Sequence, residues 1–145
     1  MNRQIPLAPL VLGITGLIPP LVGAVVAYGD IGSFGPVAGG FILVYGALIL
    51  SFLGGSWWGL ASRAERPSWL LMGLAVAPSI AAWGILSMRS TLAAGLWIAG
   101  LILISPVVDT LIAGRGLVPG WWLRLRVPLS VGLAVLIALN VWWGR

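Results

Sequence analysis

Three residue types that carry much of protein chemistry are missing from this chain. Its 145 residues include no cysteine and no histidine, and all eight basic residues are arginine, so lysine is absent too. Without cysteine and histidine the chain can form no disulfide, no Cys/His zinc site, no histidine-ligated haem and no histidine acid–base pair. We therefore predict no metal site, no cofactor and no catalytic residues of these kinds.

Charge is also scarce. Only 8% of the residues are charged and 60% are hydrophobic, whereas soluble domains carry about 25% charged residues. A chain of this composition could not solvate its own surface, so we predict an integral membrane protein in contact with lipid. The net charge of +5 comes from arginines scattered between apolar segments, which indicates membrane topology rather than a nucleic-acid-binding face.

Long apolar runs fill most of the chain. The clearest is Phe41 to Leu60, FILVYGALILSFLGGSWWGL, about twenty residues without a charge and long enough to cross a hydrocarbon core of about 30 Å. Four similar runs predict an all-α bundle of five transmembrane helices in a single domain covering 1–145. The predicted spans are 10–28, 37–60, 68–88, 92–112 and 127–143.

The arginines predict an orientation. With five spans, the N-terminus and the second and fourth loops share one side of the membrane. That side carries Arg3, Arg63, Arg66, Arg115, Arg124 and Arg126, and the other side carries Arg89 and Arg145. Positively charged loops favour the cytoplasm, so we expect a cytoplasmic N-terminus and an external C-terminus.

Small residues line the second span. Gly46, Gly54, Gly55 and Gly59 lie within it, and glycine lets another helix backbone approach closely in a membrane. We favour packing within the bundle, with this span at its centre. An interface with another subunit uses the same residues equally well.

Prolines interrupt three spans, at Pro19-Pro20, Pro78 and Pro106. A proline inside a helix removes an N–H and frees the carbonyl four residues earlier. The freed carbonyls are those of Thr15, Gly16, Leu74 and Ile102, and in lipid they need other partners, such as Thr15, Ser79 or water. We favour ordinary kinks over a broken-helix site for an ion or solute.

Asp109 is the one acid inside a predicted span. An ionisable group at such a position is a candidate functional residue. Because it lies about one turn from the cytoplasmic end, we favour an ion pair with Arg115, Arg124 or the Arg63 loop over a proton or substrate role. Together with neighbouring polar and aromatic residues it forms a candidate cytoplasmic-end site, which could hold a lipid head group. The site comprises Asp109, Arg63, Arg66, Arg115, Arg124, Arg126, Ser56 and Trp57.

Several segments resemble a known family. Tyr45–Gly59 (YGALILSFLGGSWWG), Ala77–Trp83 (APSIAAW) and Leu117–Ser130 (LVPGWWLRLRVPLS) are similar to an uncharacterised family of small multi-pass proteins. The family occurs in proteobacteria, and its eukaryotic members are called transmembrane protein sixty-nine and assigned to mitochondria. The resemblance implies a helical bundle in a bacterial inner membrane and implies no particular activity.

The absence of catalytic groups favours a non-enzymatic protein. Glycine-rich faces and the lack of a soluble domain suggest an accessory subunit or assembly factor of a larger inner-membrane complex. Two alternatives remain open. One is a small solute or proton transporter that uses Asp109 and the broken helices, and the other is a lipid- or quinone-binding membrane protein.

Overall fold

The computed structural model describes residues 4–29 and 35–144, and every regular element among them is an α-helix. The elements are α1 (Leu7–Thr15), α2 (Ile18–Tyr28), α3 (Gly35–Ala61), α4 (Trp69–Leu86), α5 (Thr91–Ala113) and α6 (Trp122–Trp143). Helices α1 and α2 together form one span, so five segments are long and apolar enough to cross a membrane. The predicted fold class, an all-α bundle of five transmembrane helices, is confirmed.

Proline breaks the first span into two helices. Pro19 and Pro20 stand in the first turn of α2, and the chain steps from α1 to α2 through Gly16 and Leu17. The freed Gly16 carbonyl accepts a hydrogen bond from the Tyr45 hydroxyl at 2.5 Å. The side chain that serves this carbonyl is therefore a tyrosine on α3, while the Thr15 hydroxyl donates to the Leu12 carbonyl instead.

The last span begins earlier than the sequence indicated. Helix α6 starts at Trp122, five residues before the predicted Val127, so Arg124 and Arg126 belong to the helix. The prediction treated these charges as part of a polar loop. However, arginine can keep its charged group near water while its aliphatic stem lies along an apolar helix. Pro128 is tolerated because it stands in the second turn of α6. Its missing N–H removes one backbone hydrogen bond, to a carbonyl near the start of the helix.

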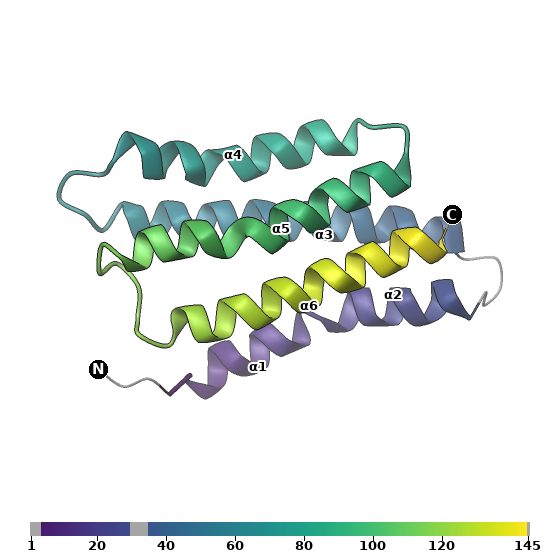
Figure 1. Cartoon of the computed structure of the whole chain (residues 1–145), viewed down its shortest axis with the longest axis horizontal. Coiled ribbons are helices and arrows are strands. Elements are labelled where there is room, and N and C mark those ends of the chain that lie inside the picture. Colours follow the sequence, from purple (N-terminus) through teal and green to yellow (C-terminus); the bar gives the residue numbers. More distant parts are fainter. Residues whose placement is uncertain (1–3, 30–34, 145) are drawn as a thin grey trace.

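Helix α3 is the centre of the bundle. It packs against α2, α4, α5 and α6, as predicted for this glycine-rich span. Figure 1 shows α4 along one edge and the broken α1–α2 span along the opposite edge, with α3, α5 and α6 between them. The core between these three inner helices contains fully buried Leu50, Ile98 and Ile137.

The glycines of α3 divide into two groups. A Cβ on Gly46 would lie 2.7 Å from Ile98 of α5, and a Cβ on Gly54 would clash with the backbone carbonyl of Ala75 on α4. These two glycines pack inside the bundle. In contrast, a Cβ on Gly55 or Gly59 would meet nothing within 4 Å, so this pair faces outward.

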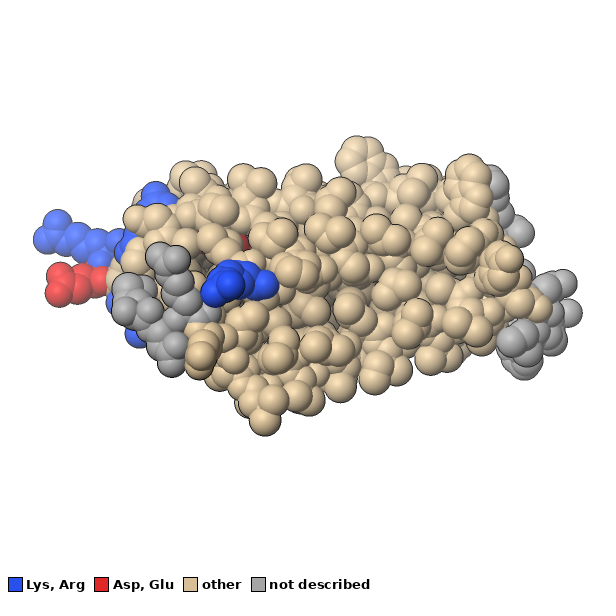
Figure 2. Space-filling model, turned by 60° about the horizontal axis from the view of Figure 1, so that its bottom comes forward, with Lys and Arg blue, Asp and Glu red and all other residues tan. Residues whose placement is uncertain are grey.

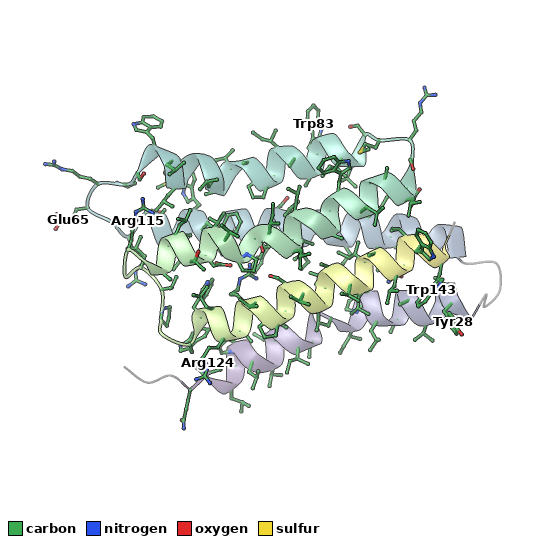
Figure 3. All side chains as sticks on the ribbon, viewed as in Figure 1. Tyr28, Glu65, Trp83, Arg115, Arg124 and Trp143 are labelled. Atoms are coloured by element: carbon green, nitrogen blue, oxygen red, sulfur yellow. The ribbon has the colours of Figure 1, made fainter. Side chains whose placement is uncertain are left out.

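Charge gathers at one end of the bundle. In Figure 2 most of the blue and red side chains in view lie at one end, and Figure 3 shows Glu65 at that same end. This arginine-bearing end holds the α3–α4 and α5–α6 connections. Arg89, in the α4–α5 connection, lies at the opposite end. Arg3 and Arg145, two of the arginines used to predict orientation, lie outside the described residues, and the orientation stays a prediction.

Candidate functional site: a buried carboxylate at the arginine-bearing end

Three helices bring polar side chains to the same depth. Trp57 lies four residues before the end of α3, Asp109 four residues before the end of α5, and Arg126 four residues after the start of α6. At 1.5 Å per residue, each is about 6 Å inside its helix end. Since these helix ends share the arginine-bearing end, the three side chains meet one turn below it.

The Asp109 carboxylate on α5 accepts hydrogen bonds from the two neighbouring helices, α3 and α6. The indole N–H groups of Trp57 and Trp122 both donate to its Oδ1, at 3.0 Å and 2.8 Å. The Arg126 Nε donates to Oδ2 at 3.2 Å, which makes an ion pair. The sequence predicted an ion pair for Asp109, but the partner is Arg126 rather than Arg115, Arg124 or Arg63.

This arrangement explains how a carboxylate can be fully buried. The side chain of Asp109 has no exposed surface, and an isolated charge there would carry a large desolvation penalty. One opposite charge and two further N–H donors offset that penalty and fix the positions of α3, α5 and α6 relative to one another. We call Asp109, Trp57, Trp122 and Arg126 the Asp109 cluster.

The Arg126 guanidinium has fewer partners than the carboxylate. A guanidinium offers five N–H donors; its Nε is used by Asp109, but its Nη2 is buried and has no hydrogen-bond partner. One turn further along α6, the Ser130 hydroxyl lies 3.4 Å from that of Ser105 on α5. Ser105 in turn donates to the Ile102 carbonyl that Pro106 frees, at 2.7 Å.

Other residues of the predicted site do not reach Asp109. Arg63 and Arg66 are exposed in the α3–α4 connection, and the Ser56 hydroxyl donates to its own helix, at the Leu53 carbonyl. Arg115 and Arg124 are also exposed at this end of the molecule, as Figure 3 shows. Arg115 donates to the Leu111 carbonyl at 3.3 Å.

Trp122 is the member of the cluster that the prediction of the site left out. The signal for it was its position four residues before Arg126, which places the two side chains on one helix face. This spacing is informative only if α6 begins at Trp122, because a separation of four residues places two side chains on the same face only within a helix.

Two cavities flank this polar region. One of about 150 Å³ lies between the α1–α2 break, α3 and α6, and Arg126 and Ser130 are among the residues that line it. The other, of about 300 Å³, lies between α3, α4 and α5 and includes Trp57 and Ser105 in its lining. Across residues 4–29 and 35–144, no three acidic side chains converge as a metal site would require.

These features define a multi-pass helical membrane protein whose spans are held together near one end by a buried ion pair. The chain belongs to the family described as "Protein of unknown function (DUF3429)", whose model matches residues 5–142. It is also 34% identical over 134 residues to transmembrane protein 69 of Xenopus tropicalis. That match covers 89% of this chain and 51% of the frog protein, so the chain spans about half the length of this relative. No solved structure matches it.

Proposed function

We propose that this protein is a non-enzymatic accessory subunit or assembly factor of a larger complex in a bacterial inner membrane. The observation that carries the proposal is the outward-facing pair Gly55 and Gly59 on α3. The pair lies one helical turn apart, and both positions are exposed with open space where a side chain would be. In a membrane, such a pair lets a helix from another protein approach the α3 backbone closely.

The surroundings of the pair also favour a partner. Next to it, Trp58 and Trp69 border a groove of about 500 Å³ between α3 and α4, which has Gly73 and Met72 in its lining. Trp69 is 94% exposed and Trp58 is 49% exposed. Tryptophan and methionine are enriched at protein interfaces, so the occupant we propose is a transmembrane helix of a partner protein that presents small residues to α3.

The state of Asp109 gives less support to the alternative of a proton or solute transporter. A proton relay needs a carboxylate that can exchange its proton with water or substrate. In this bundle the Asp109 carboxylate is fully buried and accepts three hydrogen bonds from protein donors. Its geometry suits a structural ion pair better than a residue that contacts water or substrate.

Leucine substitutions in α3 test the proposal. We expect Gly55→Leu and Gly59→Leu to abolish the larger species that the wild type forms on native gels after extraction in mild detergent at native expression. The matched control is Gly84→Leu, which fills another exposed glycine position without a neighbour on α4 and outside that groove, and this variant should retain the partner. A second copy of this chain as the sole companion would assign the face to self-association instead.

Gly54→Leu separates a lost interface from a lost fold. Because a side chain at Gly54 would clash with the Ala75 carbonyl, we expect this variant to lower the yield of folded protein, whereas the Gly55 and Gly59 variants should fold as well as the wild type. A wild-type protein that runs as a monomer with no companion at native expression would contradict the proposal.

A further inference from the structure

The cavity between the α1–α2 break, α3 and α6 has a polar wall and an apolar mouth. Arg126 and Ser130 belong to its inner side, and the rest of the lining is apolar or glycine. At the outer side stand Leu12 of α1 and Phe52 of α3, which are 72% and 70% exposed. Since both side chains are apolar and belong to membrane-spanning segments, the mouth opens towards the lipid acyl chains.

The polar wall lacks a hydrogen-bond acceptor. The Nη2 group of Arg126 is buried and has no partner, and buried donors of this kind are rare because each loses its bonds to water. Asp109 does not fill the gap, since its oxygens accept from Trp57, Trp122 and the Arg126 Nε but not from Nη2. An oxygen atom supplied from the cavity would satisfy the guanidinium.

The charges of Arg126 and Asp109 indicate which kind of ligand oxygen the cavity would accept. Arg126 and Asp109 form a pair whose net charge is zero, so a phosphate or carboxylate in the cavity would add an uncompensated negative charge beside a buried carboxylate. A carbonyl oxygen accepts the N–H without adding charge. The size of the cavity agrees, because an apolar cavity of about 150 Å³ is known to hold a benzene ring.

The depth of the site also agrees with a membrane amphiphile. Arg126 lies about 6 Å inside the end of α6, at the level where the polar part of an amphiphile meets the apolar region. Gly13 and Gly16 line the cavity along the α1–α2 break, where the Leu129 side chain packs closely against Gly13.

We propose that this cavity binds the carbonyl group of an uncharged part of a membrane amphiphile, with Arg126 as the hydrogen-bond donor. Two sources offer this chemistry: the acyl-ester carbonyl of a glycerolipid and the ring carbonyl of a quinone. The proposal goes beyond the accessory role and is independent of it, since the Gly55–Gly59 face does not line this cavity.

The experiment uses the full chain in nanodiscs of diether phosphatidylcholine, whose lipids have no ester carbonyl. In one arm a decyl-substituted 1,4-benzoquinone is titrated, and saturable quenching of tryptophan fluorescence reports binding close to Trp57 and Trp122. In the other arm a diester phosphatidylcholine is mixed in, and native mass spectrometry measures whether it is retained over the diether lipid. Binding in one arm identifies that source, and binding in both shows a site for either carbonyl.

Two variants tie the binding to the cavity. Arg126→Lys keeps the positive charge beside Asp109 but removes the remaining guanidinium N–H groups, and Ile49→Phe fills the cavity while leaving Arg126 in place. We expect each to weaken binding at least tenfold. The matched controls are Arg124→Lys, at an exposed position on the same helix, and Val107→Phe in the lining of the other cavity; both should bind within twofold of the wild type.

Three results would overturn the proposal: no saturable binding in either arm, binding that Ile49→Phe leaves unchanged, or equal loss in Val107→Phe. If Arg126→Lys fails to fold, Ile49→Phe still decides the outcome because it does not touch the ion pair. Failure here leaves the native-gel result for Gly55 and Gly59 unaffected, so the two proposals can fail separately.

Discussion

The Asp109 cluster and the contact between Tyr45 and Gly16 both join helices through polar groups, but they meet different needs. The cluster neutralises a buried charge on α5 with donors from α3 and α6. The tyrosine on α3 serves a backbone carbonyl that Pro20 leaves without its N–H. Removing a partner therefore exposes a lone charge in the first case and a lone neutral carbonyl in the second, and these differ greatly in cost.

Asn140 of α6 provides a third case with a smaller need. Its Nδ2 donates to the Pro20 and Leu136 carbonyls at 2.8 Å each, and its Oδ1 is buried without a partner. Both carbonyls lie within helices, where backbone N–H groups four residues later can serve them. The acceptors therefore differ in how much they need a side-chain donor. The Asp109 carboxylate needs its donors most, the Gly16 carbonyl less, and the two carbonyls bound by Asn140 least.

The largest effect should come from Asp109→Asn, because this substitution removes the buried negative charge of the Asp109 cluster. This change leaves the Arg126 guanidinium, 14% exposed, without its counter-ion, and we expect a loss of about 3–5 kcal/mol in the free energy of unfolding. The measurement is unfolding by SDS in mixed micelles, followed by circular dichroism. Glu65→Gln is the matched control, because that carboxylate is exposed in a loop and its loss should cost under about 0.5 kcal/mol.

The double variant Asp109→Asn, Arg126→Gln measures how much the interaction between the two charges contributes to stability, apart from the other contacts of each residue. Removing both charges should cost clearly less than the sum of the two single changes, because no charge then remains buried alone. Additive losses would show that Asp109 and Arg126 do not stabilise the bundle as a pair.

Tyr45→Phe should have an intermediate effect. It keeps the ring and removes the hydroxyl, so the Gly16 carbonyl loses the donor that replaces the missing proline N–H, at a cost of about 1–2 kcal/mol. The same SDS titration measures it, with Tyr28→Phe as control, since Tyr28 is 73% exposed and contacts Trp143 through its ring, with centroids 5.0 Å apart. Equal losses in the two variants would refute a specific role for the Tyr45 hydroxyl.

Asn140→Leu should have the smallest effect, under about 1 kcal/mol in either direction. Leucine has the same branched arrangement of side-chain heavy atoms, removes a buried acceptor that has no partner, and leaves both carbonyls with their helical N–H groups. A loss of stability as large as that of Tyr45→Phe in the same titration would contradict this expectation. It would show that the Asn140 amide stabilises the bundle even though both carbonyls already accept backbone N–H groups.

The site could be predicted in part. Asp109 stands out in the sequence because an acid within an apolar span is rare, and its distance from the helix end already favoured an ion pair. The choice of Arg126 over four other arginines at that end could not be predicted, because Arg126 was placed in a loop. Tyr45 was missed for a different reason: it is 29 residues from Gly16 along the chain, and no local pattern links them.

Composition and apolar run length alone determined that this protein crosses the membrane five times as an all-α bundle. Those properties follow from the cost of burying charge and unpaired backbone in lipid, which depends on residue type and segment length and not on neighbours. Only the tertiary structure decided which arginine reaches Asp109, which glycines of α3 face outward and which hydroxyl serves the broken helix. Each of these depends on how the helices are rotated against one another, and that rotation is set by side-chain packing between segments distant in the sequence.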